Sequence, residues 1–185
     1  LDPQTEKQAS TLTVYTTRPD TLFGATFMVV APQHPIVTSG HAGYLVPDEQ
    51  AQVVSSYIIQ AEQNAVTATE FSAPEAEKTG VLTGIYARNP VNKEKIPIFV
   101  ADYVSMDYGS GSIMAVPAHD DRDYAFAEKY QLPIVEVVEK PDGITDLCFT
   151  GDGVSINSGE TETNPFAITG LPTAEAKSKI ISALK

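Results

Sequence analysis

Short apolar runs, separated by proline, glycine and asparagine, dominate the hydrophobic pattern of this chain. Runs rich in β-branched and aromatic residues and bounded by such turn formers are typical of strands. The pattern predicts six strands, at residues 11–15, 25–31, 81–86, 96–100, 112–116 and 134–138. A polar stretch at residues 16–24 lies between the first two and is too long for a tight hairpin.

Helical periodicity is present in three places. Residues 120–130 begin with a capping acid, Asp120, and direct Tyr124, Phe126 and Ala127 toward a core. Another helix is predicted at residues 173–184, directly after Pro172. The remaining helix, at residues 48–63, carries an apolar stripe made of Val53, Val54, Tyr57, Ile58 and Ala61.

The order of these elements predicts the fold class. Strands and helices do not alternate regularly, which disfavours a doubly wound parallel sheet. We therefore expect an α+β fold that is mainly β, with a curled sheet or a six-stranded β-barrel core and flanking helices. A length of 185 residues fits one domain over residues 1–185.

Charge and composition exclude some functions. Twelve basic against 24 acidic residues give a net charge of −12, the wrong sign for coating a phosphate backbone. A single nucleotide end bound in a pocket remains compatible with this charge. The chain lacks a signal-like start and an apolar run of the ~20 residues that span a bilayer. Cys148 is the one cysteine, so an internal disulfide is excluded and a cytoplasmic location is expected.

Familiar catalytic motifs are missing: the sequence has no GxSxG, P-loop, GxGxxG or HExxH. No cofactor or metal is therefore expected. Two polar segments beside predicted strands remain as candidates. The first concentrates hydroxyls, a guanidinium and a carboxylate around the rigid Pro19, namely Thr16, Thr17, Arg18, Asp20 and Thr21. The alternative is a strand end whose hydroxyls satisfy backbone groups, with Asp20 or Thr21 capping a short turn.

The second candidate segment runs from residue 108 to residue 123. Gly109 and Gly111 permit close approach of a flat ligand, on which Tyr108 can stack. The alternative is an ordinary turn followed by a strand and a capped helix.

Acidic residues crowd the start of the predicted helix. Asp120 fits a helix cap, whereas Asp123, expected to be an exposed first-turn acid, is one of three acids in four residues. Their mutual repulsion calls for a cation, either a ligand ammonium or the nearby Arg122 or Arg18.

Other side chains near this helix start have structural alternatives. A lone histidine such as His119 is more often a hydrogen-bonded structural residue than a base. Met114 is more often part of a core than of a ligand-binding wall. Tyr103, Tyr108 and Tyr124 are expected to serve packing first.

Several segments together resemble a known family. TTRPDTLFGATFMVVAPQHP, GIYARNP, IFVADYV, YGSGSIMAVPAHDDRDYAFAEKYQLPI and ITGLPTAEAKSKIISAL resemble the editing domain inserted into the catalytic domain of leucyl-tRNA synthetase. Valyl and isoleucyl synthetases have related domains, but the Asp of TTRPDT and the run MAVPAHDDRDYAFA favour the leucyl family. HIGH and KMSKS are missing, so the chain resembles the isolated insertion and is not expected to form an aminoacyl-adenylate.

The resemblance implies a role for each candidate residue. Thr16 and Thr17 would lie around the scissile ester, and Thr21 would exclude cognate leucine. Arg18 and Asp20 would matter for hydrolysis and loop structure. Asp123 would hold the substrate's α-ammonium. The adenosine side is assigned to Tyr108, Ile113 and Met114, supported by Asp120, with His119 as a further substrate-binding candidate.

The activity implied by the resemblance is post-transfer editing. The substrate would be the ester between a wrong amino acid, such as norvaline or isoleucine, and the 3′-terminal adenosine of leucine tRNA. Further expected partners are the rest of the synthetase, AMP or adenosine analogues, and boron compounds that bind a diol. The alternative function is a non-catalytic nucleotide- or adenosine-binding module.

Overall fold

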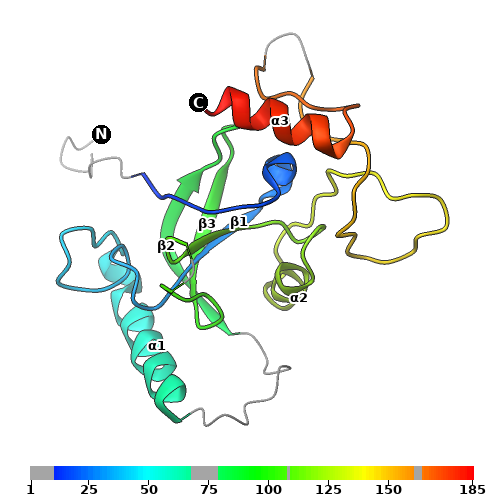
Figure 1. Ribbon diagram of the computed structural model, residues 1–185. Coiled ribbons are helices and arrows are strands. Elements are labelled where there is room, and N and C mark those ends of the chain that lie inside the picture. The colour runs from blue at the N-terminus through cyan, green and yellow to red at the C-terminus, as the bar shows by residue number, and fades with distance from the viewer. Residues whose placement is uncertain (1–10, 68–78, 108, 161–163) are drawn as a thin grey trace. The chain divides into compact units, whose positions relative to one another are not determined.

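A computed structural model describes residues 11–67, 79–107, 109–160 and 164–185. Four strands form one open sheet in the order β2-β3-β1-β4, which confirms the predicted α+β class. The sheet does not close, so the six-stranded barrel alternative is wrong for the described residues. In chain order the elements are η1 (Pro19–Gly24), β1 (Phe27–Val30), α1 (Asp48–Thr67), β2 (Gly80–Arg88), β3 (Lys95–Ala101), β4 (Ser112–Ala115), α2 (Asp121–Tyr130) and α3 (Thr173–Ala183) (Figure 1).

The chain forms two compact units, each made of segments that are distant in sequence. Unit 1 consists of residues 1–15, 29–87 and 97–113. Unit 2 consists of residues 16–28, 88–96 and 114–185. The threonine-rich segment and the acidic helix start both belong to unit 2.

Helix α1 of unit 1 extends the predicted helix at its C-terminal end. Val54 and Ala61 are buried, as the apolar stripe predicts, but Val53 is 52% exposed, so its place in the stripe is wrong. No described helix is both long and apolar enough to cross a membrane.

Strand β2 carries an irregularity that depends on glycine. Gly84 has a φ of 76°, and a Cβ there would lie 2.9 Å from the side chain of Gln50 in α1. The neighbouring Thr83 is buried, and its hydroxyl donates to the carbonyl of Ile98 in β3 at 2.6 Å. A larger residue at position 84 would therefore strain the backbone and push against α1.

The predicted strand at residues 11–15 is not formed. The carbonyl of Thr13 accepts a hydrogen bond from the hydroxyl of Ser112 at 2.5 Å and another from the hydroxyl of Ser110. At Thr13 the segment is thus held by side-chain hydroxyls, where a strand would bond a neighbouring backbone.

The predicted strand at residues 134–138 is also wrong. The backbone N–H groups of Val137 and Val138 donate to Nε2 of His119, at 2.9 and 3.1 Å. Only an isolated antiparallel bridge, between Val138 and Ser155, remains. A buried histidine ring therefore takes the amides that a strand neighbour would need.

Unit 2 has its own core, on which η1 and α3 pack. Close packing near η1 requires Gly24, since a Cβ there would lie 2.9 Å from Cγ2 of Val137 and 3.0 Å from the Val135 carbonyl. The buried members of the core are Leu22, Phe23, Val91, Val137, Ile168, Ala176 and Ile180.

Helix α2 agrees with the sequence prediction. Asp120 is its N-cap and accepts hydrogen bonds from the amides of Arg122 and Asp123. Phe126 and Ala127 are fully buried, and the Phe126 ring stacks on Phe27 with 5.3 Å between centroids. Tyr124, which was also predicted to face the core, is only half-buried.

Candidate functional site

The threonine loop, residues 16–21, includes the first half of the short 3-10 helix η1, which begins at Pro19. Oγ1 of Thr16 accepts from the amide of Arg18 at 2.9 Å, and Oγ1 of Thr21 donates to the carbonyl of Arg18 at 3.0 Å. Both hydroxyls thus satisfy backbone groups, as the structural alternative predicted, whereas Thr17 is exposed. Thr21 is only 2% exposed.

Neither Asp20 nor Thr21 caps the turn, contrary to the structural alternative. The N-cap is Arg18, whose own side chain makes no capping hydrogen bond. Asp20 and Thr21 lie inside η1, past its first residue Pro19, so neither stands at the cap position.

This Arg18–Asp20 pair forms a fork. Nη2 of Arg18 lies 2.8 Å from Oδ2 of Asp20, and Nε lies 3.1 Å from Oδ1. Asp20 is fully buried. The same guanidinium donates to the carbonyls of Thr150 at 2.9 Å and Gly151 at 3.4 Å. The pair therefore fixes the threonine loop to a segment more than 130 positions away, where charge-assisted bonds are strong.

Asp123 is buried, with 4% exposure, so the expectation of an exposed first-turn acid is wrong. Its Oδ2 accepts from the amide of Val116, just after β4, at 2.8 Å. The carboxylate is thereby held in one orientation, and truncating it would leave a buried amide without its acceptor.

The cation nearest to the acidic helix start is Arg122. Its guanidinium pairs with Asp120, with 3.0 Å between Nη2 and Oδ2. Burial by itself raises the pKa of Asp120, but the hydrogen bonds and charge of Arg122 and the amide of Asp123 outweigh it and lower this pKa. The N-cap role of Asp120 is thus shown, and a role toward adenosine stays a prediction.

His119 is buried, and both ring nitrogens bond the backbone. Nδ1 lies 2.7 Å from the carbonyl of Phe149, and Nε2 accepts from Val137 and Val138. Burial is the main cause that lowers the pKa of His119. The ring joins three backbone positions and offers no ring nitrogen to a substrate in this arrangement, which favours the structural alternative.

The structure places the residues assigned to the substrate's adenosine in different surroundings. Met114 is half-buried and packs against the core of unit 2, as the packing alternative predicted. Ile113 is half-buried in β4 and belongs to unit 1. Tyr108 lies outside the described residues.

Sequence reasoning missed one buried polar residue beside the threonine loop. Asn89 is 3% exposed, donates to the carbonyl of Leu22 in η1 at 2.8 Å and accepts from the amide of Val91 at 3.1 Å. The Asn-Pro pair at positions 89 and 90 signals a turn. That signal does not indicate which distant carbonyl the side chain reaches.

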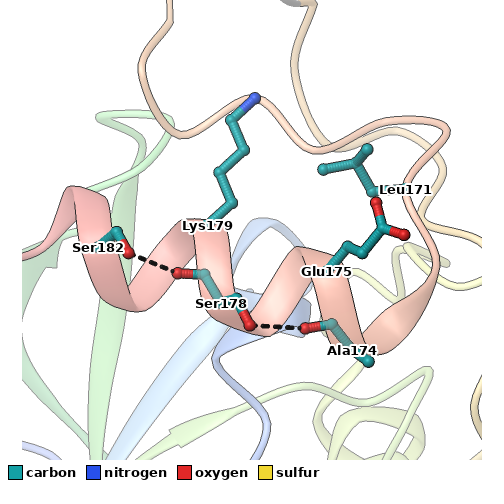
Figure 2. A pocket seen from close by; sticks show the side chains of 6 residues that line it. All are labelled: Leu171, Ala174, Glu175, Ser178, Lys179 and Ser182. Atoms are coloured by element: carbon teal, nitrogen blue, oxygen red, sulfur yellow. Dashed lines mark hydrogen bonds between the residues drawn. The ribbon is translucent and has the colours of Figure 1, made fainter.

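A hollow on the surface of α3 contains none of the predicted site residues. Figure 2 shows that the hydroxyls of Ser178 and Ser182 bond carbonyls of their own helix, those of Ala174 and Ser178. No convergent set of polar groups faces a ligand there. The hollow is lined by Leu171, Ala174, Glu175, Ser178, Lys179 and Ser182. Elsewhere in the described part of the chain, no three His, Cys, Asp or Glu residues are grouped to hold a metal ion.

The family model of the leucyl-tRNA synthetase editing domain matches residues 2–185. The chain therefore belongs to the editing-domain family of leucyl-tRNA synthetases, as the sequence resemblance predicted.

Similar proteins carry the corresponding name. A leucine–tRNA ligase of Synechococcus sp. (strain JA-2-3B'a(2-13)) is 52% identical over 83% of this chain and 18% of its own length. One from Elusimicrobium minutum is 44% identical over 100% of this chain and 20% of its own length. The chain thus spans about a fifth of the length of these relatives.

A solved structure also resembles this chain. It is LeuRS of Agrobacterium radiobacter K84 (agnB2) in a ternary complex with tRNA and LeuAMS. The match has 33% identity and a TM-score of 0.55, and covers 76% of this chain and 16% of the other.

Proposed function

We propose that this chain, acting within a full-length synthetase, hydrolyses the ester that joins a wrong amino acid to the 3′-terminal adenosine of leucine tRNA. The observation that carries the proposal is the threonine loop, held by the buried Arg18–Asp20 fork, in a chain of the editing-domain family. Norvaline and isoleucine are the proposed wrong amino acids.

Such an activity answers a physical limit on selectivity. A synthetic pocket separates similar aliphatic side chains by only about 1–3 kcal/mol, so a second site must remove what passes wrongly. Thr21 is proposed to keep cognate leucine out of this second site through its side-chain bulk.

The proposed chemistry is attack by a positioned water on the ester carbonyl. Thr16 and Thr17 would surround the ester, where hydroxyls and backbone amides stabilise the developing oxyanion. The free hydroxyl of the terminal ribose would assist. Arg18 and Asp20 hold the loop that presents these groups.

Asp123 is proposed to hold the substrate's α-ammonium. Its carboxylate is fixed through Oδ2 on Val116, and a carboxylate has about four acceptor positions, so one amide does not saturate it. Tyr108, Ile113, Met114 and Asp120 are proposed to serve the adenosine. AMP, and boron compounds that bridge the ribose diol, are proposed ligands of the same site.

Deacylation of mischarged leucine tRNA tests the proposal against the alternative of a nucleotide-binding module. The synthetase carrying Asp123→Asn should keep its fold, because an amide oxygen can still accept from Val116, and should lose most hydrolysis because the anchoring charge is gone. Asp121→Asn is the matched control, since Asp121 is exposed in the same helix turn and should leave the rate unchanged.

Three results would each contradict one part of the proposal. No hydrolysis by the parent would contradict the function, and normal hydrolysis by folded Asp123→Asn would contradict the anchoring role of Asp123. Loss of activity to a chelator, with recovery on adding zinc, would contradict the water-only mechanism. The first would leave the binding module as the better account, and AMP binding by calorimetry would then identify it. The third would replace the water-only mechanism by metal catalysis.

A further inference from the structure

The segment 149–151 is fixed at each end by groups of unit 2. At its start, the amide of Phe149 donates to the carbonyl of Ala118 at 2.9 Å, and the carbonyl of Phe149 lies 2.7 Å from Nδ1 of His119. At its end, the carbonyls of Thr150 and Gly151 accept from the guanidinium of Arg18.

The protonation of His119 follows from its partners. Nε2 faces two N–H donors, those of Val137 and Val138, and must therefore accept. A carbonyl can only accept, so Nδ1 carries the proton and donates to Phe149. The ring is neutral, and each nitrogen has a distinct task.

Phe149 and Gly151 also touch directly. A Cβ on Gly151 would lie 2.6 Å from Cζ of Phe149, so the ring lies close over the glycine. A shift of the Phe149 carbonyl would therefore carry the Gly151 and Thr150 carbonyls with it, and with them two of the acceptors of Arg18.

We infer that His119 is a positioning residue for the threonine loop, acting through the segment 149–151 on the Arg18–Asp20 fork, and not a residue that touches substrate. The inference deepens the proposed function, on which it rests for its activity readout. Misplacement of a reacting group by about 1 Å can cost about a hundredfold in rate, so a partial shift of the fork should be measurable.

Two substitutions separate the tasks of the two ring nitrogens. The amide nitrogen of asparagine takes the place of Nδ1, so His119→Asn keeps the donor to Phe149 and loses the acceptor for two amides. The amide oxygen of glutamine takes the place of Nε2, so His119→Gln keeps that acceptor and loses the donor. His119→Asn should therefore lower the Tm more, since it leaves two buried amides unsatisfied.

Activity should follow the opposite order. We expect kcat for deacylation in the synthetase to fall about tenfold in His119→Gln with KM unchanged, and to stay within about twofold of the parent in His119→Asn. Combining His119→Gln with Arg18→Lys should be no worse than Arg18→Lys alone, because both act through one contact. His34→Gln is the control, a change of a buried histidine in unit 1 that should leave kcat unchanged.

A second readout does not depend on hydrolysis. Nε–H of Arg18 donates to Asp20, so its NMR signal in the labelled 185-residue chain reports the fork. This signal should shift in His119→Gln and stay in place in His119→Asn.

The outcomes are distinct. Three results would overturn the positioning role. They are a kcat that falls in the same order as the Tm across the His119 variants, additive loss of kcat when His119→Gln is combined with Arg18→Lys, and an unchanged kcat in His119→Gln. If the parent shows no hydrolysis, the proposed function fails, and the Arg18 signal then decides: a shift confined to His119→Gln supports positioning, and any other pattern overturns it.

Discussion

In the described residues, two arginine–aspartate forks have members two positions apart in sequence, and the two forks differ in their burial and in the groups they join. In the threonine loop, Arg18 and Asp20 are 2.8 Å apart and their side chains are 23% and 0% exposed. At the start of α2, Arg122 and Asp120 are 3.0 Å apart and are 64% and 34% exposed. The two pairs thus have the same spacing in sequence and nearly the same N–O distance, but they differ in exposure to solvent.

The two guanidinium groups also bond different parts of the chain. Arg18 also binds the carbonyls of Thr150 and Gly151, so its fork joins distant segments. Arg122 pairs with the N-cap of its own helix, so its fork is local. Removing one partner of a buried pair leaves an uncompensated buried charge, and so costs more than breaking an exposed pair, whose value is about 0–1 kcal/mol.

The largest effect is expected from breaking the buried fork. Asp20→Ala leaves the guanidinium of Arg18 without its carboxylate, and should lower the free energy of unfolding by about 3 kcal/mol. Urea unfolding followed by circular dichroism measures this. A loss below about 1 kcal/mol would place both forks in the same class.

A smaller effect is expected at the exposed fork. Asp120→Ala removes the cap that accepts from the amides of Arg122 and Asp123, and should cost about 1 kcal/mol by the same urea measurement. Arg122→Ala keeps the cap and loses the surface pair with Asp120, so it should cost less than about 0.5 kcal/mol. Equal losses for the two variants would show that the ion pair, and not the cap, stabilises this helix start.

Acid should reveal a further difference between the two regions. Burial lowers the pKa of His119; the Phe149 carbonyl raises it, the charge of Arg18 lowers it, and the charges of Glu136 and Asp20 raise it. The unfolded chain therefore binds this proton more readily, and stability should start to fall as the pH drops below the ordinary value of 6.5.

The exposed fork responds at lower pH. The pKa of Asp120 is depressed, so its contribution is complete at neutral pH and is lost only as the pH falls below the ordinary 3.8. The free energy of unfolding can be measured from pH 7 to pH 3. The loss of stability that begins below pH 6.5 should occur in the parent and be missing in His119→Asn. A parent that keeps its full stability down to pH 4 would contradict the neutral, buried ring.

The sequence predicts local features of this molecule better than distant contacts. The cap at Asp120 and the inward position of Phe126 follow from the order of residues within the helix, and both were predicted. The strand at residues 134–138 was not correctly predicted, because its amides bond His119, which is 18 positions away. Local propensity cannot show that a ring from another segment takes those amides.

The candidate site shows the same limit. The threonine loop and the acidic helix start were identified from their composition, but the carbonyls of Thr150 and Gly151 carry no side-chain signal. The burial of Asp123 was missed for a related reason, since its partner is the backbone amide of Val116. Backbone partners are invisible to residue-type patterns.

The central claim, that the threonine loop selects and hydrolyses wrongly charged tRNA, is tested most directly at Thr21. The measurement is deacylation of norvalyl- and leucyl-tRNA by the synthetase carrying parent Thr21, Thr21→Ala or Thr21→Val. Alanine removes the bulk that we propose to exclude the branched leucine side chain, whereas valine keeps the bulk and loses the hydroxyl bond to the Arg18 carbonyl. We predict that the parent and Thr21→Val clear norvaline and spare leucine, and that Thr21→Ala hydrolyses leucyl-tRNA at least about tenfold faster than the parent. Continued sparing of leucine by a folded Thr21→Ala variant that still clears norvaline would contradict the claim.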